Sequence, residues 1–453
     1  MTSEARSTWR FPKEFWAANL TELFERMAYY ACLIYLVVYL TREVGFDDSE
    51  AGTIAALFAF FAWFIPAFMG ALADKWGFRF ALALAYSFLT LGYFLLGAIP
   101  SKPVAILSLV LIGLGLATVK PVITGTSTRC SDEHNRARAF SLYYLIVNFG
   151  AFIGKLLADP VRSFFRDDAA GISGLREVNY YAAGAAFIAL IITLVAFRVK
   201  HEPGKGKSFG EIASGLFTVL KNGRFMCLIF ITAGFWFIQG QLYATMPKYL
   251  LRMVSDFAKP GWLANVNPLS VALFVVPVTY LVRKIRPVSS IGIALMIIPF
   301  SALSVALTPA LVEAGILGET VNLILFSLHP VMLMLVVGIA IQGVAECFLS
   351  PRYYEFASKQ APKGEEGLYM GYQFLNVAIA WLGAFFVSGH LLEIWCPSKE
   401  VVAAMPPEQA AHAYDHAHYI WFIYALIGVA AFVALIIFRY VTDRMDRKAG
   451  VLD

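Results

Sequence analysis

Long apolar stretches alternate with short polar connections along the whole chain. Each stretch approaches or exceeds the roughly 20 residues that an α-helix needs to cross a bilayer. We therefore expect an all-α, multi-pass membrane protein. The pattern predicts about twelve spanning segments, near residues 15–41, 49–73, 78–99, 103–127, 138–159 and 178–198 in the first half and 224–250, 262–283, 288–309, 324–350, 366–393 and 416–440 in the second.

The composition excludes several classes of protein. Of the 453 residues, 59% are hydrophobic and 15% are charged, whereas soluble domains carry about 25% charged residues. The apolar runs are too long, and alternate too little, for the strands of a β-barrel. A formal net charge of +5 gives no support for nucleic-acid binding. The five Cys are scattered without CxxC spacing, so we expect neither a disulfide nor a metal site.

The connections predict how the chain is oriented and divided. Most of their Lys and Arg lie on the side of the N-terminus, which predicts that both termini are cytoplasmic. No cleavable signal pattern precedes the first segment, so we expect that segment to stay in the mature protein, in the plasma (inner) membrane. The longest basic connection predicts an N-terminal bundle at 1–198, a cytoplasmic linker at 199–223 and a C-terminal bundle at 224–453. Apolar residues at helical spacing from Phe209 to Leu220 fit an amphipathic surface helix, with a solvated tether as the alternative.

This arrangement of six plus six segments resembles the major facilitator superfamily, in which a substrate cavity lies between two bundles. The loop from Gly70 to Arg79, which contains Asp74, resembles that superfamily's GxLaDrxGrr loop. In the superfamily the loop latches the cytoplasmic helix ends, and the resemblance implies a gating role for Asp74. An ordinary inside loop is the alternative, but it does not explain the glycines Gly70 and Gly77.

The first segment carries Glu22, Glu25 and Arg26. Each such charge costs about 2.5 to 3.5 kcal/mol at the centre of a spanning helix, so these side chains must face protein or water. Steps of three and four residues place them on one helix face together with Tyr29 and Tyr30. Burial and repulsion between the two acids favour a protonated form, which Arg26 opposes. One of the acids can therefore carry a proton near neutral pH.

The pattern ExxERxxYY formed by these residues is similar to the signature of the proton-dependent oligopeptide transporter (POT) family. Four further parts of the family pattern follow in the same order along the chain. The chain is therefore identified as a divergent member of the POT family. The four parts are Lys120-Pro121, Asn148 within NFGAFI, Asn267-Pro268, and Glu346 with Ser350-Pro351 and Ala361-Pro362-Lys363.

The resemblance implies a proton-coupled symporter of di- or tripeptides or peptide-like molecules that works by alternating access. It needs no cofactor beyond the proton gradient, and its partners are a small substrate, protons and the lipid bilayer. We expect it to act as a monomer. The resemblance implies that Glu22, Glu25 and Arg26 couple protons, that Tyr29, Tyr30, Trp63, Lys120, Asn148, Asn267, Glu346 and Gln373 bind substrate, and that Asp74, Lys120 and Glu346 gate the cavity.

Lys120 and Glu346 are lone charges of opposite sign in opposite halves of the chain. The residues alone suggest that they pair across the cavity or bind the two ends of a substrate. A salt bridge with a purely structural role is the alternative. Other readings of the whole chain have less support, because neither a nucleophile–base pair nor clustered metal ligands are visible in the segments, as a membrane enzyme would require. A sensor would ordinarily bring a soluble output domain.

The chain departs from the POT pattern near the expected outer gate. Many peptide carriers pair an Arg of the first segment with a Glu of the seventh, where this chain has Leu33 and Gly240. The outer gate must then close by packing or through other polar groups. Lys155, about two helical turns after Asn148, is a candidate replacement for the missing cation, with a Lys that extends to the outer interface as the alternative.

The pocket differs as well, since Gln373 and Trp63 replace a common Trp and a common Tyr of the family. Transport of another small polar or anionic solute is therefore the rival hypothesis. A polar loop with His412, Asp415, His416 and His418 could bind Zn²⁺, but it has no Cys partner, and we expect no metal there.

Overall fold

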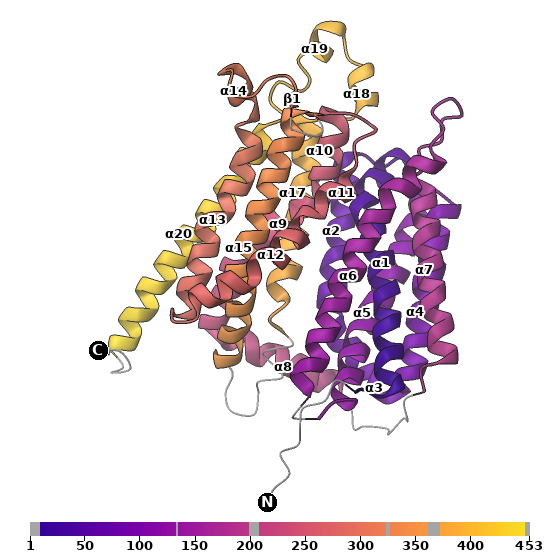
Figure 1. The fold of residues 1–453 in the computed structure, drawn as a ribbon, viewed down its shortest axis with the longest axis vertical. Coiled ribbons are helices and arrows are strands. Elements are labelled where there is room, and N and C mark those ends of the chain that lie inside the picture. The colour runs from indigo at the N-terminus through magenta and orange to yellow at the C-terminus, as the bar shows by residue number, and fades with distance from the viewer. Residues whose placement is uncertain (1–9, 133–134, 199–207, 323–326, 361–371, 449–453) are drawn as a thin grey trace, which may run out of the picture. The chain divides into compact units, whose positions relative to one another are not determined.

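The computed structural model describes residues 10–132, 135–198, 208–322, 327–360 and 372–448 (Figure 1). Among these residues, eleven helices are long and apolar enough to cross a membrane, and the bent pair α2 and α3 forms a twelfth candidate span. The described strands are β1 (Val321–Asn322) and β2 (Ser327–Leu328), which pair antiparallel. The predicted all-α fold of a multi-pass membrane protein is confirmed.

The chain forms two compact units that do not follow chain order. The first contains Met1–Phe46 and Phe61–Ser214, and the second contains Asp47–Phe60 and Gly215–Asp453. The boundary after Ser214 falls inside the predicted linker 199–223. The segment Asp47–Phe60 comes early in the chain but packs with the later helices, so helix α2 (Asp48–Phe64) belongs partly to each unit.

In the first unit, α1 packs against α5, α6 and α7, while α4 packs against α5 and α7 (Figure 1). Two glycines bring α6 directly onto α1, since a Cβ added at Gly150 would lie 2.7 Å from the carbonyl oxygen of Leu23 and one at Gly154 would meet the carbonyl oxygen of Met27. The helices of this unit besides α2 are α1 (Lys13–Arg42), α3 (Pro66–Trp76), α4 (Phe78–Ala98), α5 (Lys102–Arg129), α6 (Arg136–Phe165) and α7 (Leu175–Val195).

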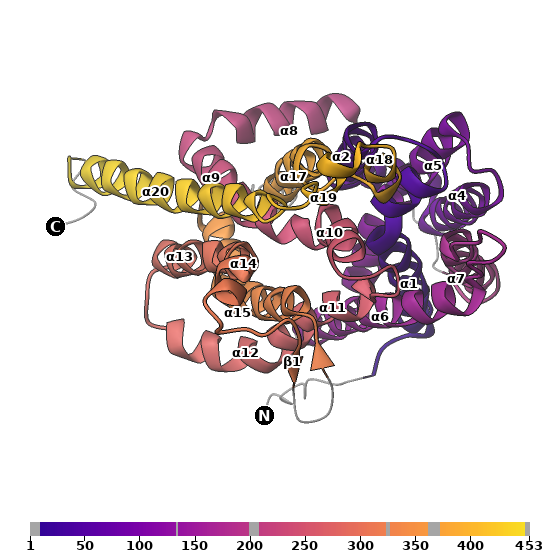
Figure 2. The same cartoon turned by 90° about the horizontal axis from the view of Figure 1, so that it is seen from above.

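In the second unit, α13 packs against α15 and α20, α9 packs against α17 and α20, and α12 packs against α15. The C-terminal end of α20 projects beyond its neighbours in this unit (Figure 2). The helices are α9 (Gly223–Ala244), α10 (Met246–Met253), α11 (Pro260–Ala264), α12 (Val266–Val282), α13 (Pro287–Ala306), α14 (Thr308–Glu313), α15 (Pro330–Gln360), α17 (Leu375–Trp395), α18 (Lys399–Ala403), α19 (Pro407–Ala411) and α20 (Tyr419–Lys448). Helix α8 (Phe209–Lys221), which contains the unit boundary, confirms the helix expected from Phe209 to Leu220.

Several predicted segments are not single helices. The segment 49–73 bends by 55° between α2 and α3, and Pro66 begins α3. The segment 224–250 breaks at Thr245, two residues before Pro247, and the segment 262–283 divides into α11 and α12. A proline has no backbone N–H and its ring clashes with the preceding turn, so it favours a new helix start over a continued helix. The predicted spanning segments are present, and at these points they contain breaks.

Candidate functional site

The charged face of α1 is buried. Glu22 and Glu25 are 0% exposed and Arg26 is 4% exposed. The Nε of Arg26 contacts a carboxylate oxygen of Glu25 and lies 3.4 Å from Oε1 of Glu22, to which the Tyr143 hydroxyl donates at 3.4 Å. The structure thus brings together the three residues predicted to couple protons. The single Arg26 guanidinium can neutralise only one of the two acids. A proton on either acid therefore removes the repulsion between them.

Lys120 belongs to the same group of charges. It lies on α5, and its ammonium interacts electrostatically with Glu22, Glu25 and Arg26. Its Nζ stands 3.7 Å from the ring centre of Trp63, and both side chains are half-buried. We name Glu22, Glu25, Arg26 and Lys120 the α1–α5 cluster; it holds two acids and two cations.

Aromatic rings continue the polar face of α1. The Arg26 guanidinium lies 5.2 Å from the ring centre of Tyr29, and the rings of Tyr29 and Tyr30 are 5.0 Å apart. Lys155 on α6 is 2% exposed, with its Nζ 5.7 Å from the centre of the Tyr30 ring. A Lys buried against α1 does not extend to solvent, so that alternative for Lys155 is wrong.

Two other predicted residues, Asn148 and Asp74, form polar contacts with residues of the first unit. The side-chain amide of Asn148 donates to the carbonyl oxygen of Tyr144 at 2.8 Å, within α6. Asp74 forms a half-exposed ion pair with Arg129 at 3.2 Å, and the Arg129 guanidinium lies 3.9 Å from the ring centre of Phe78. The superfamily-like loop is therefore tied to the end of α5.

In the second unit, Asn267 and Glu346 lie side by side. The amide of Asn267 on α12 donates to Oε2 of Glu346 on α15 at 3.5 Å, so each helix contributes one residue to this polar pair. The buried Gln373 accepts a hydrogen bond at its backbone oxygen from the Tyr353 hydroxyl at 2.9 Å. Lys120 and Glu346 belong to different units, so their pairing stays a prediction. The motif Ala361-Pro362-Lys363 lies outside the described residues.

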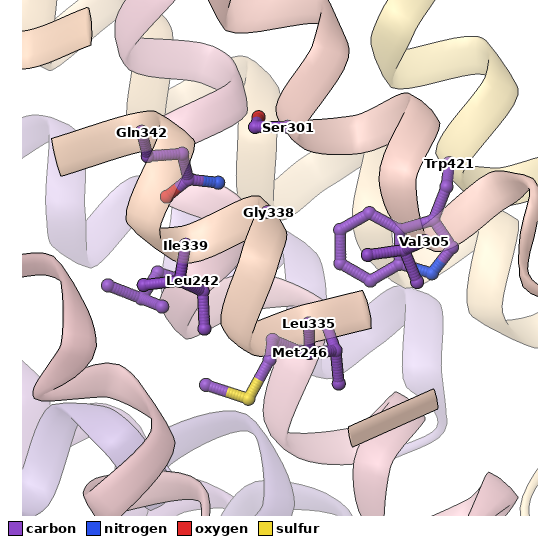
Figure 3. A pocket seen from close by; sticks show the side chains of 9 residues that line it. All are labelled: Leu242, Met246, Ser301, Val305, Leu335, Gly338, Ile339, Gln342 and Trp421. Atoms are coloured by element: carbon purple, nitrogen blue, oxygen red, sulfur yellow. The ribbon is translucent and has the colours of Figure 1, made fainter. Parts of the chain in front are cut away.

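A small cavity opens within the second unit one helical turn from Glu346. Most of its walls are apolar, and Figure 3 shows Gln342 and Trp421 among the side chains that line it. Oε1 of Gln342 and Nε1 of Trp421 have no hydrogen-bond partner among the described residues. The sequence singled out none of the lining residues, which are Leu242, Met246, Ser301, Val305, Leu335, Gly338, Ile339, Gln342 and Trp421.

The sequence analysis missed a second buried group of charges, in the second unit. Oδ1 of Asp48 accepts hydrogen bonds from Nζ of Lys248 at 2.6 Å and from Nη2 of Arg252 at 2.8 Å. The three residues, named here the Asp48 cluster, are 7%, 3% and 8% exposed. Charges at the ends of apolar segments were the available signal, but they gave no indication of pairing between residues so far apart in the chain.

A third group was also missed, on the face of α6 that carries Lys155. The Tyr35 hydroxyl donates to Oδ1 of Asp159 at 2.5 Å, and the Arg162 guanidinium lies 5.2 Å from the Tyr35 ring centre. Asp159 and Arg162 follow Lys155 by four and seven residues, the spacing of one helix face. That spacing was the signal in the sequence.

The two departures at the expected outer gate have a structural basis. Leu33 is 1% exposed in the core. A Cβ added at Gly240 would lie 3.1 Å from Cβ of Ala384, so α9 packs closely on α17 at this position. Uncharged hydrogen bonds hold the end of α9 instead. The Thr245 hydroxyl lies 2.6 Å from Oε1 of Gln241 and 2.7 Å from the hydroxyls of both Ser388 and Tyr424.

The side chains of the histidine loop contact their neighbours in the sequence. Within the described ranges, no group of three His, Cys, Asp or Glu side chains is arranged to hold an ion. Nδ1 of His412 lies 2.7 Å from Oδ2 of Asp415, while His416 stacks on Tyr419. Burial lowers the pKa of His418, which disfavours its charged form.

The comparisons with known proteins define the family. The model for the Major Facilitator Superfamily matches residues 19–319, and the chain belongs to that superfamily. It is 25% identical to Solute carrier family 15 member 1 of Mus musculus, over 49% of this chain and 34% of that protein. It is 26% identical to Dipeptide and tripeptide permease A of Erwinia pyrifoliae, over 52% of this chain and 46% of that protein. The matches thus span less than half of either relative.

A solved structure agrees over nearly the whole chain. The POT family transporter PepTSo superimposes with a TM-score of 0.72 at 16% identity, covering 96% of this chain and 99% of that chain. Together with the curated relatives, this similarity confirms the resemblance to the POT family that the motifs indicated. The protein is an integral, multi-pass membrane protein whose relatives are transporters.

Proposed function

We propose that the protein is a proton-coupled symporter of small peptides or peptide-like molecules that works by alternating access. The observation that carries this proposal is the α1–α5 cluster. With both glutamates ionised, its two acids balance its two cations. A proton on either glutamate leaves one cation in excess, which favours an anionic group of the substrate beside Lys120. Proton binding and substrate binding thereby support each other.

Gradient-driven accumulation in proteoliposomes tests this coupling. Glu22→Gln and Glu25→Gln should abolish pH-driven accumulation, while at least one of them still exchanges substrate. Glu14→Gln, on the first turn of the same helix and outside the cluster, is the matched control and should accumulate substrate like wild type. Intact pH-driven accumulation by both cluster variants would contradict the assignment.

A second candidate function is transport of a non-peptide polar or anionic solute. It is favoured by the apolar, closely packed surroundings of Leu33 and Gly240, where many peptide carriers place a charge pair. Because Leu33 stands where many peptide carriers have an Arg, binding of a peptide carboxylate depends on Lys120 or Lys155. We therefore expect unmodified dipeptides to bind weakly, and a thermal-shift panel of peptides and metabolites separates the two candidates, since a ligand of the folded state raises the melting temperature.

For outer closure we propose the Asp48 cluster. The start of α2 docks on α10 through Asp48 and on α17 through Gly52, where a Cβ would lie 2.6 Å from the carbonyl oxygen of Phe385. This contact joins the start of α2 to α10 and α17 within the second unit, on the side predicted to be external. In wild type it should protect the native Cys396, which is 0% exposed and whose carbonyl oxygen accepts from Arg252, from an impermeant maleimide more than in Asp48→Asn. Equal labelling would contradict a role in closure.

A further inference from the structure

The indole ring of Trp63 covers one side of Lys120, the cation of the α1–α5 cluster that lies on α5. The Lys120 ammonium stands 3.7 Å from the centre of the Trp63 ring. An ammonium over an aromatic face is attracted by the ring quadrupole, and the indole of Trp gives the strongest such attraction. The ring therefore competes with any anion for Lys120.

Trp63 lies next to the break between α2 and α3, and the packing of α3 on α5 determines its position. Helix α2 ends one residue after Trp63, at Phe64, and Pro66 begins α3. Helix α3 then meets α5 beside Lys120, since a Cβ added at Gly70 would lie 3.1 Å from Cβ of Pro121. The corner between α2 and α3 thus holds the indole against the residue that precedes Pro121.

The surroundings of Lys120 give this contact a consequence. Glu22 and Glu25 attract the ammonium and Arg26 repels it. When one glutamate takes up a proton, the attraction from α1 weakens, and the Trp63 ring and an incoming anion compete for the Lys120 ammonium. A larger or smaller ring at position 63 then changes how strongly that anion binds.

We propose that Trp63 is a specificity-determining residue that caps Lys120 and weakens capture of a substrate carboxylate. The identity of the substrate rests on the proposed function, whereas the contact between Trp63 and Lys120, called the cap here, does not depend on it. The chemistry predicts discrimination between two ligands that differ in one charge, a free carboxylate and its neutral amide. Ligands that bring an uncharged group to Lys120 should be unaffected by the cap.

The binding experiment uses L-alanyl-L-alanine and its C-terminal amide, measured against purified wild type, Trp63→Leu, Trp63→Tyr and Lys120→Met. Removal of a half-buried cation–ring contact corresponds to roughly a two- to thirtyfold gain in affinity for the carboxylate ligand. Trp63→Leu should show this gain, Trp63→Tyr a smaller one, and the amide should not change. Equal changes for both ligands would make Trp63 an ordinary wall of the pocket and overturn the proposal.

A cycle of thermal unfolding midpoints tests the cap without any ligand. Trp63→Leu and Lys120→Met should be non-additive, because each removes the same contact. The matched control pairs Lys120→Met with Trp76→Leu, a half-exposed tryptophan of α3 whose ring packs on Phe80. That pair should be additive. Additivity of the Trp63 pair would overturn the cap, while a non-additive cycle without peptide binding in any variant supports the cap and contradicts the proposed peptide substrate.

Discussion

The α1–α5 cluster of the first unit and the Asp48 cluster of the second unit are both buried within helical bundles, but their charges are balanced differently. The first has two acids for two cations, with Arg26 placed between Glu22 and Glu25. The second has one acid for two cations, and Asp48 accepts hydrogen bonds from both. When one glutamate of the first cluster is protonated, that cluster has one ionised acid for two cations, which is the ratio in the second cluster.

Under the proposed function, this difference separates a cluster that exchanges a proton from one that resists protonation. Two neighbouring acids repel each other, so a proton on one of them removes an unfavourable interaction. A proton on Asp48 would instead leave Lys248 and Arg252 facing each other without an acid. Buried ion pairs are costly to break, because the remaining partner stays uncompensated. We therefore interpret the Asp48 cluster as a fixed contact and the α1–α5 cluster as the variable one.

The largest effect is expected for Asp48→Asn. Loss of the acid leaves two buried cations without a counter-charge, which costs about 3 to 5 kcal/mol in folding stability. The unfolding midpoint of the purified protein should fall accordingly. The neighbouring Asp47→Asn is the control, since Asp47 is exposed and its Oδ1 accepts from Ser49 and the Glu50 N–H, which an amide oxygen can also do. Similar midpoints for the two variants would mean that Asp48 does not hold this contact.

A smaller loss is expected for Gly389→Ala. Gly389 lies directly against the backbone of Asp48, so a Cβ there would separate α17 from the start of α2. Overpacking of this kind costs about 1 to 3 kcal/mol. Gly184→Ala is the matched control, because a Cβ at Gly184 meets nothing within 4 Å. A Gly389 variant as stable as this control would show that the close approach is not required.

The two clusters also differ in how far the sequence predicts them. Glu22, Glu25 and Arg26 are neighbours along one helix, so their spacing alone places them on one face, and a resemblance to a known family adds Lys120. Asp48, Lys248 and Arg252 have no local pattern, and their pairing depends on α2 packing with later helices. Helix periodicity predicted the spans, but it could not predict which helices meet or where α2 and α9 break.

The third effect concerns ligand affinity and leaves stability aside. Lys120→Ala or Glu346→Ala removes a charged hydrogen-bond partner worth about 1.5 to 3 kcal/mol, which corresponds to roughly ten- to hundredfold in affinity. Isothermal titration of the best ligand from the thermal-shift panel measures this change. Affinities within twofold of wild type for both variants would mean that these charges have only a structural role.

The smallest effect is expected for Glu25→Gln, the same acid-to-amide change as Asp48→Asn but in the other cluster. Glu22 remains 3.4 Å from Arg26 and continues to neutralise it. The amide oxygen of the substituted side chain can still accept a hydrogen bond from Arg26, and repulsion between the two acids disappears. The unfolding free energy should therefore change by no more than about 1 kcal/mol, the net value of one hydrogen bond. Because Asp48→Asn should cost several times as much, the pair of variants measures the difference between the clusters directly. A loss from Glu25→Gln as large as that from Asp48→Asn would show that both clusters are fixed ion pairs, and proton exchange would then have to be sought outside α1.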